Sequence, residues 1–362
     1  MTGAKCIPIP APLSHKSSSR PHGCQHFPGH ELPTGKSPKT ISDYLDLNAF
    51  ALLLVNLQAC LLRCSGKERL WHYWSQYGQA FGLAALISFC TSCQAPAERQ
   101  QQLAQQLGLS ALQVSGKGFS HRLFLNAPAA ALLGTSGKLT VRPPAEFARL
   151  HVYLEGDGDP WLNRTQPAPD PTARHPLALP LLASDPAPAL YLGRPCYDGL
   201  ARTSGCAPRY WTSHRYSEAV VASMAAALRQ VPHYQASSDT VLIGHSGGAT
   251  LAMLLAARLP RIRAVVSLAG NLDPDAWARL HQYSPLTGSL NPALGPALPD
   301  TITQIYFLGA ADRNIPPTLF PVTLLQQNNV RMILVEEYNH RCCWLQDWRS
   351  LLSQIDKILS KR

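Results

Sequence analysis

The stretch DTVLIGHSGGATLAMLLAARLP (Asp239–Pro260) decides the fold of this chain. It opens with the apolar run TVLI, which is typical of a buried strand, and it closes with a run of helix formers. Between the two runs, the residues Gly244-His245-Ser246-Gly247-Gly248 fit the pattern G-x-S-x-G. Glycines on both sides let the turn tighten until Ser246 is strained and its hydroxyl projects above the sheet. The stretch therefore predicts a strand, a tight turn and a helix of an α/β protein.

The same alternation extends to both sides of this stretch. Helices are predicted over 97–112, 215–231 and 344–359, between apolar runs that read as strands. The predicted strands begin at His121, Lys138, Leu150, Ala189, Arg263, Thr303 and Val330. Near-continuous apolar strands separated by helices indicate a mostly parallel sheet with helices on both faces. Residues 271–300 lack periodicity, and we expect them to form a small, loop-rich cap over an open site.

Composition narrows the classes of protein. The chain has 362 residues, of which 46% are hydrophobic, so it can bury a full core. Its net charge of +10 comes from 32 Lys and Arg against 22 Asp and Glu, with no basic run. A nucleic-acid face needs clustered cations with stacking aromatics, so we expect no nucleic-acid partner.

The ten cysteines show no paired C-x-x-C spacing of a zinc site. Cys196 and Cys206 flank a short loop that contains glycines, which suits a local disulfide in an oxidising compartment. The alternative is a pair of free, buried thiols.

The N-terminal quarter bears on cellular location. Residues 1–66 are predicted to be a disordered or spurious extension. Residues 67–93 follow the order of a signal peptide: positive charges, an apolar run and small residues. The segment ends at Cys93 in TSC, similar to the cleavage box of a bacterial lipoprotein, although Cys90 stands where an aliphatic residue is usual. We therefore expect the domain 94–362 in the cell envelope, with Cys93 as a lipidation site; the alternative is a buried helix of a cytoplasmic protein.

A serine needs a base and an orienting carboxylate to become a nucleophile. Asp312 follows one predicted strand in GAADRNIPP, and His340 follows the last predicted strand in VEEYNHRCCW. The chain order Ser246, Asp312, His340 resembles the α/β-hydrolase superfamily of serine hydrolases over about residues 115–360. The resemblance implies that Ser246 is the nucleophile, that His340 is the base and then the acid, and that Asp312 orients His340.

Each of the two partners has a competitor. His281 also lies downstream of the serine, but it falls in the expected cap. Asp273 follows the preceding strand, where some members of the fold place the acid. We prefer Asp312 because GAADRNIPP resembles the usual acid loop of the family; Asp273 then shapes the pocket or starts the cap.

An oxyanion hole needs two backbone N–H groups. One is expected from Gly247, directly after the serine. The other is expected from LEGDGDPW, where Gly156, Asp157 and Gly158 are the alternatives. The acidic residues of this loop raise the question of a metal, but two carboxylates without further spaced ligands are weak evidence, so we expect no metal and no cofactor.

These features predict a serine hydrolase that cleaves an ester, a thioester or an amide of a small molecule through an acyl-enzyme, most simply a carboxylesterase. The alternatives are a peptidase or an acyltransferase on the same scaffold, and a non-catalytic envelope binding protein. The LEGDG loop and the RPC…C…YW segment resemble uncharacterised bacterial envelope members of the superfamily, which implies no particular substrate.

Overall fold

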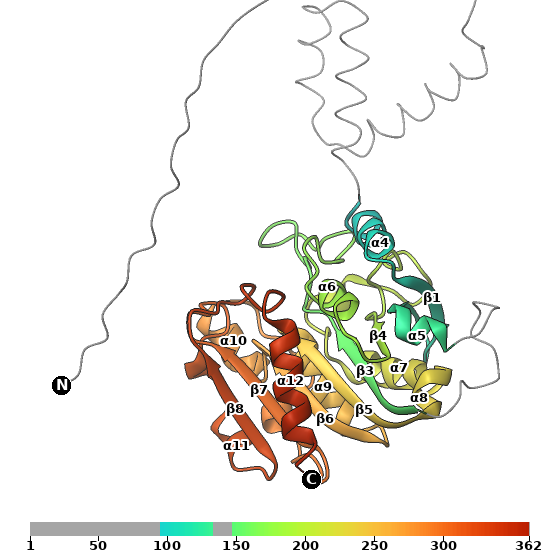
Figure 1. The fold of residues 1–362 in the computed structure, drawn as a ribbon. Helices are drawn as coiled ribbons and strands as arrows, with labels where there is room; N and C mark the ends of the chain where they lie inside the picture. Colours follow the sequence, from blue (N-terminus) through green and yellow to red (C-terminus); the bar gives the residue numbers. More distant parts are fainter. Residues whose placement is uncertain (1–94, 133–146, 362) are drawn as a thin grey trace, which may run out of the picture. The chain divides into compact units, whose positions relative to one another are not determined.

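The computed structural model of the chain describes residues 95–132 and 147–361. Their strands form an eight-stranded sheet in the order β1-β2-β4-β3-β5-β6-β7-β8 (Figure 1). β2 pairs antiparallel with β1 and β4, whereas the remaining neighbours are parallel. This order, with an antiparallel second strand, defines the α/β-hydrolase fold. The strands are β1 (Ser110–Ser115), β2 (Ser120–Leu125), β3 (Phe147–Leu154), β4 (Ala189–Leu192), β5 (Ser237–His245), β6 (Ile262–Leu268), β7 (Thr303–Gly309) and β8 (Val330–Val335).

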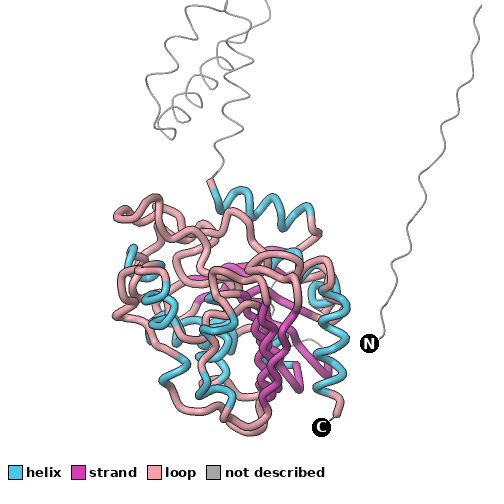
Figure 2. Tube along the Cα trace, turned by 90° about the vertical axis from the view of Figure 1, so that its left-hand side faces the viewer, coloured by secondary structure: helices cyan, strands magenta, loops and turns pink. Residues whose placement is uncertain are grey.

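Helices cover both faces of this sheet. In Figure 1, α6 and α12 lie in front of the strands and α9 lies behind them, and Figure 2 shows the strands as a layer between helices. The α-helices are α4 (Pro96–Gln106), α5 (Ala127–Ala131), α6 (Ala178–Ala183), α7 (Glu218–Arg229), α8 (Pro232–Ala236), α9 (Gly247–Ala256), α10 (Pro274–Leu280), α11 (Val322–Leu325) and α12 (Trp348–Leu359).

Side chains alternate between the two faces, as the pleat of a strand requires. On β3, Val152 and Leu154 face the core beneath α7 and α9, whereas Tyr153 faces the core beneath α6 and α12. On β5, Leu242 faces the first core and Ile243 the second. Because both faces are buried, these strands read as continuous apolar runs in the sequence.

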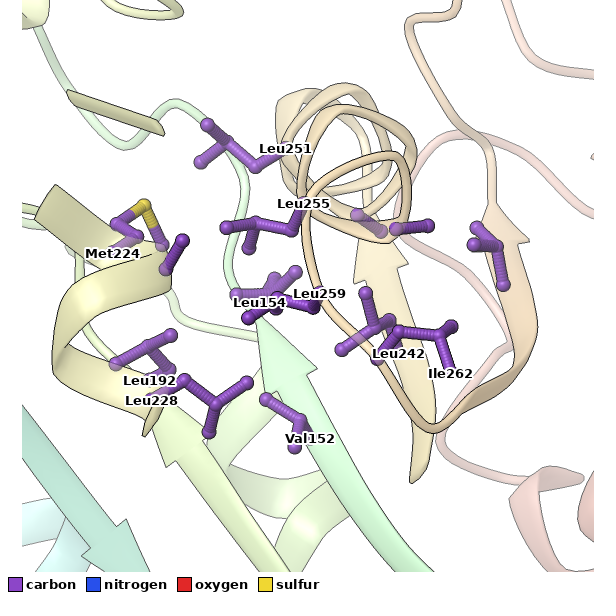
Figure 3. Close-up of a cluster of buried hydrophobic side chains, with 14 of the residues drawn as sticks. Val152, Leu154, Leu192, Met224, Leu228, Leu242, Leu251, Leu255, Leu259 and Ile262 are labelled. Atoms are coloured by element: carbon purple, nitrogen blue, oxygen red, sulfur yellow. The ribbon is translucent and has the colours of Figure 1, made fainter. Parts of the chain in front are cut away.

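The core beneath α7 and α9 fixes the helix that follows the serine. Figure 3 shows Leu251 and Leu255 of α9 packed toward Val152, Leu154 and Leu242 of the sheet and toward Met224 and Leu228 of α7. These side chains are almost fully buried. Burying one such side chain stabilises the fold by about 1.5–3 kcal/mol, so the position of α9 is held by several of them together.

The strand order also indicates where a site should lie. The chain places β4 on one side of β3 and then β5 on its other side. Loops that leave β3 and β5 therefore diverge, and they open a crevice at the carboxyl ends of these two strands. The loop that begins at Glu155 and the turn at Ser246 both lie there.

The helix predicted over 97–112 is too long. α4 ends at Gln106, and residues 110–115 form strand β1 instead. Gly108 has φ +69°, a left-handed conformation that glycine adopts readily and that ends a helix. The helix predicted over 215–231 begins later, at Glu218, because the side chain of Ser217 caps it by accepting from the amide of Val220.

The expected cap over 271–300 holds α10 and the short 3-10 helix Pro292–Leu294 between irregular segments. Residues 1–66, 67–93 and Cys93, on which the predictions about location depend, lie outside the described residues, and so does the strand predicted from Lys138. In the described ranges, none of the helices has the length and apolar character needed to cross a membrane.

Candidate active site

The turn at Ser246 has a geometry that few side chains tolerate. β5 ends at His245, α9 begins at Gly247, and Ser246 between them has φ 54° and ψ −122°. Such a positive φ is strained for a residue with a Cβ atom, and it persists only where the surroundings enforce it. Three main-chain hydrogen bonds of 3.0 Å hold Ser246. Its amide donates to the carbonyl oxygen of Leu268, and its carbonyl oxygen accepts from the amides of Ala249 and Asn271.

Glycines on both sides of the serine make room for this turn. A Cβ atom on Gly248 would collide with the carbonyl oxygen of Leu154, and one on Gly244 would collide with the amide of Ala249. The two glycines therefore allow α9 to start directly against the end of β3.

The structure brings together the three residues that the sequence singled out. Nε2 of His340 lies 3.1 Å from Oγ of Ser246, and Nδ1 of His340 lies 2.8 Å from Oδ2 of Asp312. The three side chains come from the loops that follow β8, β5 and β7, so the parallel strands deliver them to one edge of the sheet.

Asp312 is buried at 3% exposure, and its second oxygen is also engaged. Oδ1 accepts hydrogen bonds from the amides of Asn314 at 2.8 Å and Ile315 at 2.9 Å. These bonds fix the carboxylate, which leaves Oδ2 aimed at the imidazole of His340.

The environment of His340 favours its neutral ring. Burial is the largest influence and lowers the pKa of His340 below its ordinary value of 6.5, while the hydrogen bond to Asp312 works in the opposite direction. Nearby His245 and Arg341 lower the pKa further. A neutral imidazole whose Nδ1 proton is held by Asp312 presents a lone pair on Nε2 to Ser246.

Two residues with no role in the sequence analysis hold His340 in place. Nε2 of His245 lies 2.8 Å from the main-chain oxygen of His340, and the side-chain amide nitrogen of Asn314 lies 3.0 Å from Nε2 of His340. His245 stands within the G-x-S-x-G motif and Asn314 stands two residues after Asp312. Their closeness in the sequence to Ser246 and Asp312 is the one sequence feature that could have predicted a role for them.

The loop after β3 passes directly beside the serine turn. A Cβ atom on Gly156 would sit 3.4 Å from Cβ of Ser246, so the backbone of the loop approaches the serine closely. The amide of Gly156 donates to Oε1 of Glu155 at 2.9 Å, and it is therefore not free to bind a substrate. Of the alternatives raised for the second oxyanion donor, Asp157 and Gly158 are left.

Asp157 is held by a buried network of opposite charge. Its two carboxylate oxygens lie 2.9 Å from Arg194 and 2.9 Å from Arg215, and the hydroxyl of Tyr216 donates to them. Burial by itself would raise the pKa of Asp157, but Arg215, Arg194 and the Tyr216 hydrogen bond outweigh it and lower the pKa to about 2. Asp157 is thus an anion, and both of its carboxylate oxygens are already bound by guanidinium groups and by the Tyr216 hydroxyl. Neither oxygen is placed as a metal ligand.

Cys196 and Cys206 are joined as a disulfide at the base of the loop that carries this network. Tyr197, next to the first cysteine, donates from its hydroxyl to the main-chain oxygen of Asp157 at 3.0 Å. Arg194 lies two residues before Cys196 and forms an ion pair with the Asp157 carboxylate. The long segment between β4 and α7 therefore contacts and positions the loop after β3, which lies beside Ser246.

The two competitors are placed elsewhere. Asp273 is the N-cap of α10: its Oδ1 accepts from the amide of Ala276 at 3.0 Å and from the side chain of Asn291 at 2.8 Å. Asp273 therefore starts the cap, which was one of the two roles expected for it. His281 ends α10 and its Nε2 lies 2.7 Å from the carbonyl oxygen of Asn314. No contact joins either residue to Ser246 in the described part of the chain.

Ser246 and His340 open into a cavity of about 1180 Å³. Pockets for drug-sized ligands typically measure about 300–1,000 Å³, so the cavity has room for a ligand of that size. The loop after β3 and the end of α10 both contribute to its lining. Among residues 95–132 and 147–361, no three His, Cys, Asp or Glu side chains are grouped so as to hold a metal ion.

Comparisons with known proteins find similar solved structures but no related sequence family. No family model and no curated protein matches the chain. Solved structures match at low identity: an esterase of Pyrococcus furiosus at 13% (71% of this chain, 94% of the other; TM-score 0.45) and a serine hydrolase without lid from Xanthomonas campestris at 12% (68% and 92%; 0.42). An α/β serine hydrolase homologue of Coxiella burnetii matches at 14% identity (67% and 95%; 0.40). The α/β-hydrolase fold of this chain rests on its own strand order.

Proposed function

We propose that this protein is a serine hydrolase that cleaves a carboxylic ester through an acyl-enzyme. The observation that carries the proposal is the unbroken series of contacts from Ser246 to His340 to Asp312, at the end of the sheet and open to a cavity. A strained serine against the neutral nitrogen of a histidine that is itself held by a buried carboxylate is the arrangement that activates a hydroxyl.

In the proposed reaction, Oγ of Ser246 attacks the carbonyl carbon of the ester while Nε2 of His340 takes the hydroxyl proton. Asp312 holds the ring and stabilises the imidazolium that forms. The imidazolium then gives its proton to the departing alcohol, which leaves the acyl group on Ser246. A water molecule deprotonated by His340 attacks the acyl-enzyme, and the carboxylic acid departs as Ser246 regains its proton.

We propose the amides of Gly247 and Asp157 as the donors to the oxyanion. Gly247 is the first residue of α9, whose N-terminus adds positive partial charge. Asp157 lies beside it, since a Cβ atom on Gly247 would collide with the carboxylate of Asp157. The guanidinium groups of Arg194 and Arg215 neutralise this carboxylate, so its charge does not oppose an oxyanion nearby.

The test is covalent labelling of the full chain by a fluorophosphonate, compared with Ser246→Ala and His340→Ala. The matched control is Ser284→Ala, which removes another serine of the same cavity. We expect the wild type and the control to be labelled and both of the other variants to stay unlabelled. A folded wild type that takes no label would overturn the proposal in favour of a binding protein.

Hydrolysis assays then separate the related activities. We expect 4-nitrophenyl esters to be cleaved with a burst of nitrophenol and peptides to be left intact. Cleavage of peptides would indicate a peptidase. Transfer of the acyl group to an added alcohol, at the expense of release to water, would indicate an acyltransferase.

An envelope location is a separate proposal, supported by the order of residues in 67–93. The mass of the mature N-terminus tests it. A lipid-modified Cys93 is expected, and a mature chain that begins at residue 1 would contradict the proposal.

A further inference from the structure

The mouth of the cavity carries a group of unpaired positive charges. Arg164 and Arg174 come from the loop between β3 and α6, and Arg341 follows His340; all three line the cavity and are exposed. In the described ranges, none of the three guanidinium groups lies within ion-pair distance of a carboxylate.

The acidic residues of the same cavity offset these cations only in part: Glu155 and Asp157 are engaged elsewhere, and Asp159 is one carboxylate against three arginines. Glu155 is buried and accepts from the amides of Gly156 at 2.9 Å and Ala178 at 2.8 Å. Asp157 is neutralised by Arg194 and Arg215. The carboxylate of Asp159 accepts from the main-chain amide of Arg174 at 2.9 Å.

The positive charge extends to the reacting centre. Arg341 is adjacent to His340 in the chain, and its guanidinium is close enough to lower the pKa of the His340 ring. Because the three arginines line the same cavity as Ser246 and His340, an anionic group held by one or more of them can belong to the same molecule whose ester lies at Ser246. The cavity volume of about 1180 Å³ leaves room for a molecule that carries both an ester and an anionic group.

The part of the cavity lined by the end of α10 has a different character. Trp277, His281 and Tyr283 at the end of α10 pack edge to face or stacked, with ring centroids 5.1–5.7 Å apart, and all three line the cavity. Tyr283 is 55% exposed. This part of the lining offers aromatic contact and contributes no Arg or Lys side chain to the cavity, whereas Arg164, Arg174 and Arg341 come from other segments.

We propose that the site takes an ester that carries an anion, a carboxylate or a phosphate, on the part of the molecule that lies against Arg164, Arg174 and Arg341. The inference rests on the proposed function, because it concerns the substrate of the same serine. Exposed cations attract an anion through a field that salt screens over about 8–10 Å. The preference should therefore be strongest at low ionic strength.

The experiment measures kcat/KM of the full chain for esters matched in length. One pair places the charge on the alcohol: 4-acetoxybenzoate against its methyl ester, with 4-acetoxyphenyl phosphate as the phosphate counterpart. A second pair places it on the acyl group: mono-4-nitrophenyl adipate against methyl 4-nitrophenyl adipate. The readout is the ratio of anionic to neutral substrate within a pair after subtraction of the uncatalysed rate, so changes in the amount of folded enzyme cancel.

The variant replaces Arg164, Arg174 and Arg341 together by Gln. The control replaces three exposed arginines outside the cavity, Arg202, Arg331 and Arg349, by Gln, and changes the net charge equally. Three exposed charge–charge interactions together correspond to a preference of about tenfold. We expect such a preference in the wild type and the control, and a ratio near one in the cavity variant and at high salt.

The outcomes separate the two proposals. If the wild type cleaves neither member of any pair, the proposed function fails. If it cleaves both members of each pair equally well, the function stands and the anionic substrate is wrong. A preference that the control loses as much as the cavity variant would also overturn the inference, because the net charge of the protein would then explain it. The benzoate and phosphate arms show which anion is favoured.

Discussion

The ring of His245 lies 2.8 Å from the main-chain oxygen of His340, and the centroids of the two rings are 5.0 Å apart. The residue in front of the serine therefore holds the backbone of the histidine that contacts this serine. On its other side, Nδ1 of His245 lies 3.8 Å from the carboxylate of Glu155. Glu155, His245 and His340 connect the loop after β3 to the loop after β8, across the turn at Ser246.

Replacing His245 by Ala should lower activity without abolishing it. The variant loses the hydrogen bond that fixes the backbone of His340, which is worth about 1 kcal/mol, or roughly a fivefold to tenfold loss in kcat/KM. Steady-state hydrolysis of a neutral 4-nitrophenyl ester measures the change. His175→Ala, an exposed histidine of the same cavity, is the control and should stay within about twofold. A loss as large as that of His340→Ala would show that His245 itself transfers protons.

The pH dependence of kcat/KM should show a base that titrates below pH 6.5. Burial lowers the pKa of His340, and only the neutral ring accepts the serine proton, so activity should rise with pH and be level by about pH 7. Arg341 lowers the same pKa by its charge. Arg341→Gln should therefore move the acidic limb of the profile to higher pH, while the distant control Arg349→Gln leaves it in place. A limb that stays unchanged in Arg341→Gln would contradict this account of His340.

The parts of the site that the sequence predicted are those that local patterns determine. A strand, a G-x-S-x-G turn and a helix follow one another in a single stretch, so the place of Ser246 depends on neighbours along the chain. Asp312 and His340 each follow a strand, and parallel strands bring the residues after their carboxyl ends to one edge. The fold class followed from the same alternation of apolar runs.

The surroundings of Asp157 could not be predicted in this way. Its partners Arg194 and Arg215 stand in a segment with little periodicity, and their contacts depend on the path of that segment over the end of the sheet. From the sequence alone, Asp157 is a candidate oxyanion donor or a weak candidate metal ligand. The extent of α4 was mistaken because its helix-forming composition outweighed the stop at Gly108.

Asp157→Asn should destabilise the protein strongly at neutral pH. The substitution leaves the buried guanidinium groups of Arg194 and Arg215 without their anion, which typically costs about 3–5 kcal/mol. Urea unfolding followed by circular dichroism measures the free energy. Asp159→Asn is the control: its carboxylate accepts a single main-chain hydrogen bond, and we expect a loss of about 1 kcal/mol.

The effect of Asp157 should also depend on pH in a defined direction. The pKa of this carboxyl is about 2 in the folded protein against an ordinary value of 3.8, so the folded state favours the charged form. This contribution, about 2 kcal/mol, is fully present above pH 3.8 and is lost as the pH falls toward 2. The difference between wild type and Asp157→Asn should therefore shrink between pH 5 and pH 2. A difference that is constant over this range, or below 1 kcal/mol at pH 7, would refute the network.

The disulfide between Cys196 and Cys206 should support both stability and activity. Its two cysteines are 10 residues apart, and in the chain-entropy account a link of this span stabilises the folded state by about 3 kcal/mol. The loop that it closes presents Tyr197 to the main chain of Asp157, so its release should also disturb the proposed oxyanion donor. We expect the double variant Cys196→Ser, Cys206→Ser to unfold at lower urea and to lose kcat more than it raises KM. Unchanged unfolding together with two alkylatable thiols at these positions in the native wild type would show that the cysteines are free and that the loop is held by packing alone.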